Sequence, residues 1–174
     1  MNFFETSEQS ENYLNINGKS NNVLFLPAFN GLGAPFWDSD IRGGFYGLTQ
    51  DSSIQDMVTA CFNSVAFQTK EITSILEKYD IKVSSLLVDG GMVKNKTFCQ
   101  ILANSLEKEI LQPQNVESTA LGACIVAMAS SGDDISNIKA SDMDIFKPNV
   151  ENTISIKKSY DEWKSYLIHT MRPK

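Results

Sequence analysis

The stretch "LLVDGGMVKNKTFCQILANSL", Leu86–Leu106, contains two kinds of secondary structure joined by a glycine pair. Apolar residues lead to Gly90 and Gly91, and apolar residues recur at helical spacing from Asn95 to about Glu107. The run before the glycines is typical of a buried strand, and the pattern after them is typical of a helix. The stretch therefore predicts a strand, a tight turn and a helix.

The glycine pair and Asn95 allow two interpretations. Glycine lets a ligand approach the main chain because no Cβ intervenes, and the positive end of a helix dipole favours a nucleotide phosphate or a polar base edge. Asn95 would then turn its amide toward the ligand. The alternative is a turn without a ligand, in which Asn95 caps the helix. No Lys-Ser/Thr pair follows and the spacing is not G-x-G-x-x-G, so neither phosphate-loop motif is present.

The rest of the chain alternates strands with helices, which predicts an α/β layered fold. Residues 1–22 form a polar lead-in with at most a short helix, and residues 23–174 are expected to form one lobe. A polar loop is expected between Gly132 and Tyr160. Strands are expected at Asn22–Phe29, Gly43–Thr49 and within "EILQP", and helices from Ser52 or Ser53 to Leu76, over Thr119–Ser130 and over Tyr160–Met171.

The composition argues against several functional classes. The 174-residue chain has a net charge of −6, so it lacks the basic face that nucleic acid or an acidic membrane requires. No apolar run approaches the roughly 20 residues of a membrane span, and nothing resembles a signal peptide, so we expect a cytoplasmic protein. Cys61, Cys99 and Cys124 lie in apolar helical patterns that indicate buried reduced thiols. The single histidine, His169, provides no zinc cluster and no Ser-His pair.

Two other segments have both a structural and a functional interpretation. Small residues in "ESTALGACIVAMASSG", Glu117–Gly132, would let a nucleotide or another backbone approach a helix, or would serve only tight helix packing. In "NGLGAPFWDSDIRGG", Asn30–Gly44, Asp38 and Asp40 are candidates for a general base or a magnesium ligand. The interpretation we favour is a buried pair between one of these aspartates and Arg42 that shapes the loop.

Four segments occur together in the order and spacing of one known family. They are "FLPAFNGLGAPFWDSDIRGGFYGLT" from Phe25, "AFQTKEI" from Ala66, "VDGGMVKNKTFCQILANSL" from Val88 and "ESTALGACIVAMASSG" from Glu117. The chain resembles the glycerol kinases, which are FGGY carbohydrate kinases within the actin/hexokinase/Hsp70 superfamily. Ala34-Pro35-Phe36-Trp37 and Asp89-Gly90-Gly91-Met92 resemble glycerol kinases more than xylulose or gluconate kinases. Ser39 and Asn104 depart from the Pro and Asp that are usual in the family.

The resemblance implies roles for the opening stretch. Gly90, Gly91 and Asn95 would contact the adenosine side of ATP or ADP in a ribonuclease H-like nucleotide-binding lobe that is incomplete at its N-terminal end. The Thr119–Gly122 segment would lie beside the same cleft, where it would help the two lobes to hinge or pack. The intact enzyme would transfer the γ-phosphate of Mg-ATP to glycerol.

The resemblance also implies what is missing. Glycerol kinases are about three times this length, counted as domains of typical size. Their N-terminal lobe supplies the base, the glycerol contacts and most phosphate contacts, so we expect no catalytic residue and no metal ligand in this chain, and no activity from it alone. The alternatives are a non-catalytic truncated or split-enzyme module, which joins a separate N-terminal lobe or self-associates, and part of a kinase for another polyol or sugar.

Overall fold

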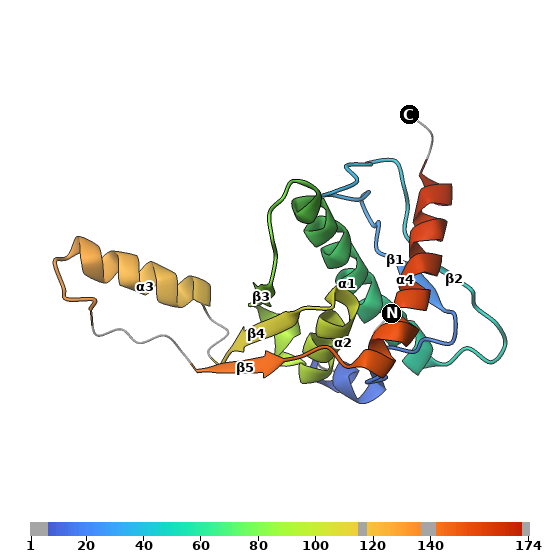
Figure 1. Cartoon of the computed structure of the whole chain (residues 1–174), viewed down its shortest axis with the longest axis horizontal. Coiled ribbons are helices and arrows are strands. Elements are labelled where there is room, and N and C mark those ends of the chain that lie inside the picture. The colour runs from blue at the N-terminus through green and yellow to red at the C-terminus, as the bar shows by residue number, and fades with distance from the viewer. Residues whose placement is uncertain (1–6, 115–117, 137–141, 172–174) are drawn as a thin grey trace.

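The computed structural model describes residues 7–114, 118–136 and 142–171, which form a mixed α/β structure (Figure 1). Its elements in chain order are the 3-10 helix η1 (Ser7–Tyr13), β1 (Leu24–Leu26), β2 (Gly44–Tyr46), α1 (Ile54–Lys78), β3 (Ser85–Leu87), the 3-10 helix η2 (Gly91–Lys94), α2 (Lys96–Leu106), β4 (Glu109–Pro113), α3 (Ser118–Ser130), β5 (Met143–Phe146) and α4 (Val150–Thr170).

The strands form two separate sheets. β1 and β2 pair antiparallel. In the other sheet, whose order is β3-β4-β5, β3 is parallel to β4 and β5 is antiparallel to it. The predicted strands and helices are all present; β1 and β2 are shorter than predicted, and α4 is longer. Two features differ from the prediction: β5 lies within the expected polar loop, and α4 begins at Val150 instead of Tyr160.

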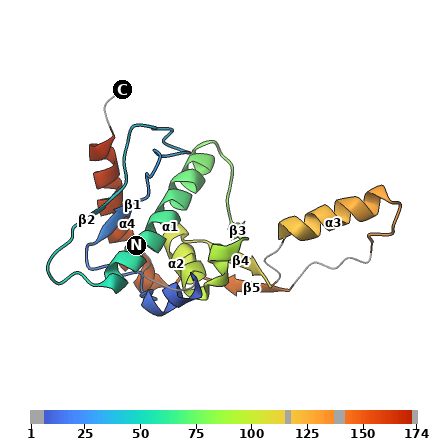
Figure 2. The same ribbon diagram turned by 180° about the vertical axis from the view of Figure 1, so that it is seen from behind.

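The hydrophobic core lies between α1, α2, α4 and β1, and α2 packs against both other helices. Phe67 of α1, Ile101 of α2 and Trp163 of α4 are almost fully buried. Trp163 Nε1 donates a hydrogen bond to the carbonyl oxygen of Phe25 in β1 at 2.9 Å. The largest buried side chain therefore keeps its polar atom paired. Figure 2 shows these elements together on one side of the molecule, with the β3-β4-β5 sheet beside them.

The long helix α1 begins as the sequence predicted. Ser53 Oγ accepts from the N–H of Asp56 at 3.2 Å, and the Asp56 carboxylate accepts from the N–H of Ser53 at 2.9 Å. This reciprocal pair is a capping box, which satisfies two N–H groups that the first helical turn leaves without partners.

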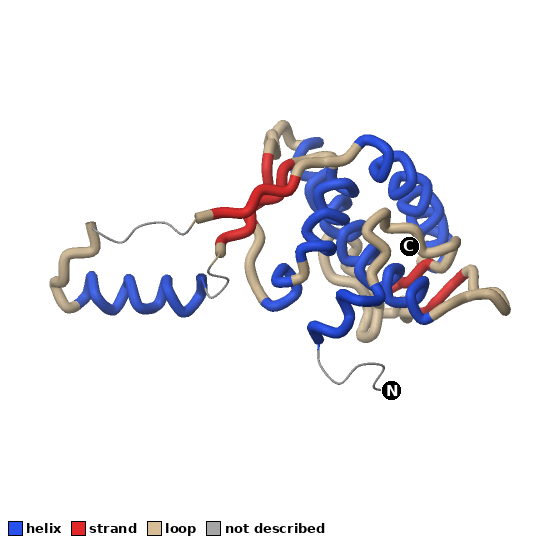
Figure 3. Tube along the Cα trace, turned by 90° about the horizontal axis from the view of Figure 1, so that it is seen from below, coloured by secondary structure: helices blue, strands red, loops and turns tan. Residues whose placement is uncertain are grey.

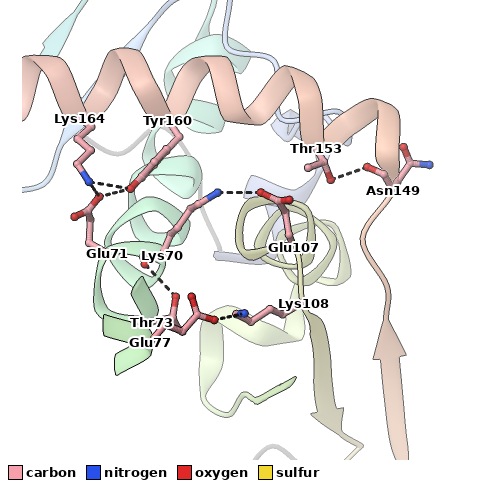
Figure 4. Close-up of polar contacts among 10 residues, drawn as sticks. All are labelled: Lys70, Glu71, Thr73, Glu77, Glu107, Lys108, Asn149, Thr153, Tyr160 and Lys164. Carbon is pink, nitrogen blue, oxygen red and sulfur yellow. Dashed lines mark hydrogen bonds and ion pairs between the residues drawn. The ribbon is translucent and has the colours of Figure 1, made fainter. Parts of the chain in front are cut away.

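Polar contacts attach α1 to its neighbours (Figure 4). The buried carboxylate of Glu71 accepts from the Tyr160 hydroxyl and pairs with Lys164 Nζ at 2.7 Å, and both partners belong to α4. At the far end of α1, Glu77 pairs with Lys108 at 2.5 Å. The Glu71 contacts fix how α4 lies across α1.

The helix α3 stands apart from the rest of the molecule in Figures 1, 2 and 3. Its side chains are exposed along almost its whole length, including that of Cys124. The predicted burial of the three cysteines is therefore right for Cys99, partial for Cys61 and wrong for Cys124. The reason is that α3 projects beyond the sheet instead of packing on it.

Candidate functional site

The glycine pair after β3 forms a turn whose geometry depends on Gly90. Gly90 has φ +101° and ψ 176°, a conformation that is almost restricted to glycine. Its N–H donates a hydrogen bond to the Asp89 carboxylate at 2.7 Å. Gly91 then opens η2, and α2 begins only at Lys96. The glycines therefore precede a single 3-10 turn, and the helix predicted from Asn95 to about Glu107 follows it as α2.

Asn95 has one side-chain atom paired and one unpaired. Its Oδ1 accepts from the N–H of Phe98 at 2.9 Å, so Asn95 is the N-cap of α2. Its Nδ2 is buried and has no hydrogen-bond partner in the structure. A buried donor without a partner costs about 1–3 kcal/mol. The capping interpretation of Asn95 is thus confirmed, and its amide nitrogen lacks a partner among the described residues.

A cavity of about 400 Å³ lies against this turn, a size within the usual range for small-molecule sites. Its lining combines η1, α1 and the turn: Ser10, Glu11, Phe62, Gly91, Met92, Lys94 and Asn95. A Cβ added to Gly91 would meet no atom of the described residues within 4 Å. The packing of the described residues therefore does not require glycine at that position, whereas close approach by a ligand would.

Two buried side chains stabilise the turn by donating hydrogen bonds to the same acceptor. Cys99 Sγ and Gln112 Nε2 both donate to the carbonyl oxygen of Val93, at 3.3 and 2.8 Å. Burial, with a smaller contribution from Asp144, raises the pKa of Cys99 to about 11. The thiol is therefore protonated and unreactive at neutral pH, and its role is to support the turn.

Of the residues that line this cavity, sequence reasoning singled out Gly91 and Asn95 as site residues and missed the other five, which are Ser10, Glu11, Phe62, Met92 and Lys94. Ser10 and Glu11 come from the polar lead-in, which carries no periodic signal. Phe62 lies in the apolar pattern of α1, and this pattern predicts a side chain in the hydrophobic core. Gly90 shapes the turn without lining the cavity. The Thr119–Gly122 segment lies on α3, away from this cavity, so its expected position beside the cleft is not seen.

The expected buried pair between Arg42 and a loop aspartate is wrong. Asp38 Oδ1 accepts from the N–H groups of Asp40 and Ile41, at 2.9 and 3.3 Å. The exposed Arg42 guanidinium donates to the carbonyl oxygens of Ser39 and Ile41, at 2.8 and 2.9 Å. Each side chain binds nearby main chain because the loop is tight. They stabilise the loop separately, and neither lines the cavity.

Among the residues that the structure describes, no three His, Cys, Asp or Glu side chains gather closely enough to hold a metal ion. None of the described helices combines the length and the apolar character that crossing a membrane requires.

The fold matches one class of enzymes. The crystal structure of Plasmodium falciparum glycerol kinase with ADP is similar to this chain with a TM-score of 0.77 and 27% identity, over 98% of this chain and 35% of that one. A gluconate kinase from Lactobacillus acidophilus has a TM-score of 0.76 and 25% identity, over 97% and 35%. The class is that of carbohydrate kinases with an actin-like fold, and the predicted fold class is confirmed.

The family follows from the sequence match. Residues 4–131 match the C-terminal domain of the FGGY family of carbohydrate kinases, and the chain belongs to this family. A glycerol kinase from Marinomonas sp. (strain MWYL1) is 38% identical over 165 residues, which are 92% of this chain and 32% of that protein. One from Alteromonas mediterranea is 38% identical over 152 residues. The chain thus spans about a third of the length of the curated relatives it matches.

Proposed function

We propose that this chain is the C-terminal, nucleotide-binding portion of a glycerol kinase, and that the whole enzyme phosphorylates glycerol to glycerol 3-phosphate. The curated relatives quoted above are glycerol kinases, and the Ala34-Pro35-Phe36-Trp37 loop resembles theirs. A kinase for another polyol or sugar is the alternative, since a gluconate kinase has a similar fold. We place the lobe at residues 23–174, after a lead-in of residues 1–22, in a cytoplasmic protein.

The adenosine side of ATP or ADP is the ligand that we assign to the cavity. The observation that carries this assignment is the buried, unpaired Nδ2 of Asn95 beside Gly91. An amide donor can bind a ring nitrogen of the base or a ribose oxygen, and Gly91 leaves room for a ring to approach the main chain. Gly90 contributes by fixing the turn.

The rest of the chemistry requires residues that this chain does not supply. Phosphoryl transfer depends on holding the nucleotide and the acceptor hydroxyl in line, with Mg²⁺ and a base in place. The described residues contain no group of three side chains that could hold Mg²⁺. We propose that the catalytic base and the glycerol contacts belong to a further kinase lobe, and that this chain alone is inactive.

ADP titration by calorimetry tests the nucleotide assignment. Asn95→Ser keeps a capping oxygen but removes the amide donor, so α2 stays capped while ADP binding weakens by roughly tenfold. Gly91→Val fills open space in the cavity and has the same effect. Gly33→Val is the matched control, because a Cβ at Gly33 also meets nothing within 4 Å and lies outside the cavity. ADP affinity that is unchanged in both site variants would refute the assignment.

A second measurement tests inactivity. The chain, mixed with glycerol and Mg-ATP, should give no glycerol 3-phosphate above the rate of a heat-unfolded sample. Turnover by the purified chain would show that the catalytic groups are present after all.

A further inference from the structure

The β3-β4-β5 sheet has one covered face and one open face. On the covered face, Ile110 of β4 is fully buried toward α2. Neighbouring side chains along a strand point to opposite faces, and on the other face Leu87 aligns with Leu111 and Leu111 with Ile145. Leu87 is 62% exposed and Ile145 is 55% exposed. An apolar row therefore crosses the sheet on the side that faces solvent.

The two edges of this sheet also differ. The edge strand β5 contains Asp144, which pairs with Lys96 at 2.8 Å, and is followed by Lys147, which pairs with Glu109 at 3.3 Å. Charges of this kind discourage a further strand from pairing. In contrast, β3 has no charged residue, and within the described part of the chain no second strand pairs with it. The β3 edge is therefore open to strand addition.

The projecting helix α3 is a third apolar feature at the same sheet (Figure 3). It carries no charged residue, and its apolar side chains lie around its circumference, with Val126 66% exposed. A helix that is apolar on all sides is normally buried. These three features together form an exposed apolar surface that another polypeptide would bury. We call it the docking surface; it consists of the row Leu87, Leu111 and Ile145, the free edge of β3 (Ser85–Leu87) and α3 (Ser118–Ser130).

We propose that the docking surface binds the polypeptide that forms the rest of an FGGY kinase, an inference that rests on the proposed function. Solved relatives continue far beyond the matched part, since this chain corresponds to only 35% of the Plasmodium falciparum chain. An apolar row beside an unpaired strand is the surface left when neighbouring strands of a sheet belong to another segment. Pairing between two copies is disfavoured, because each carries a net charge of −6.

Co-expression tests this proposal. The probe is the N-terminal part of the Marinomonas sp. glycerol kinase that precedes the matched region, carrying an affinity tag, produced together with the 174-residue chain. We expect the chain to co-purify with the tag as a one-to-one complex by light scattering. Leu87→Lys places an unpaired charge in the interface and should lower the yield by roughly tenfold or more. Ile168→Lys on α4 is the control at a position of 60% exposure, and its yield should equal that of the wild type.

Three results would overturn the proposal. They are failure of the wild-type chain to co-purify, equal yields from Leu87→Lys and Ile168→Lys, and a homodimer of the chain alone that Leu87→Lys dissociates. The last result would assign the surface to a second copy. ADP titration of the chain alone separates this proposal from the proposed function, because the docking surface does not include the cavity. A complex that forms while the chain binds no ADP would refute the nucleotide assignment and leave the docking surface standing.

Discussion

Replacing Tyr160 with Phe removes one hydroxyl from the contact that holds α4 against α1. That hydroxyl donates to the buried carboxylate of Glu71, which also pairs with Lys164 at 2.7 Å (Figure 4). A hydrogen bond to a charged group contributes about 1.5–3 kcal/mol. Lys164 still pairs with Glu71 in the variant. We therefore expect the free energy of unfolding to fall by about 1.5 kcal/mol, the lower end of this range.

Urea unfolding followed by tryptophan fluorescence measures this loss, since Trp163 lies 5.7 Å from Phe67, ring to ring, in the same contact. With a slope of about 2 kcal/mol per molar urea, the midpoint should fall by roughly 0.7 M. Tyr166→Phe is the matched control on α4, because Tyr166 is partly exposed and stacks on Tyr46 through its ring. Its midpoint should move by less than about 0.25 M.

The same hydroxyl gives a dependence on pH. Burial, together with the hydrogen bond to Glu71, raises the pKa of Tyr160 to about 12. A tyrosine in the unfolded chain ionises near pH 10, so this stabilisation is complete below about pH 10 and is lost as pH rises toward 12. Between pH 9 and 11.5 the wild type should therefore lose more stability than Tyr160→Phe. Equal midpoints for wild type and variant at pH 8, or parallel losses with pH, would refute the reasoning.

Two further predictions concern the turn and α3. Gly90→Ala should lower the free energy of unfolding by about 1–3 kcal/mol, because Gly90 has a backbone conformation almost restricted to glycine. Gly91→Ala should change the free energy of unfolding by less than about 0.5 kcal/mol. Equal urea midpoints for the two variants would contradict this difference. In the folded chain, Cys124 should react with Ellman's reagent while buried Cys99 reacts only after unfolding. Peptide mass mapping identifies the modified thiol, and a protected Cys124 would mean that α3 is covered.

Local signals made much of the fold and part of the site predictable. Ser53 and Asn95 are strong capping residues placed directly before apolar helical periodicity, and each caps the helix expected of it. The strand before Gly90 was readable because an apolar run ends in turn-forming residues. The family resemblance was carried by the same segments, since turns and caps leave distinct residue patterns.

The remainder depends on contacts that a local pattern does not encode. β5 alternates over only four residues, and it is defined by its pairing with β4. The first half of α4 has little apolar periodicity, and Asn149 at its start is fixed by Asn104 of α2, whose Oδ1 accepts the Asn149 N–H at 2.8 Å. The contribution of Glu11 to the cavity likewise depends on η1 lying beside α1 and the turn.

The most direct test of the nucleotide assignment is the NMR signal of the Asn95 side-chain amide, identified by its absence in Asn95→Ser. Addition of ADP should shift this signal and slow its exchange with water, because the unpaired Nδ2 gains an acceptor. Asn63 provides an internal reference, since its Nδ2 already donates to the carbonyl oxygen of Gly18 at 2.9 Å and should not respond. An Asn95 amide signal that stays unchanged at saturating ADP would contradict the account.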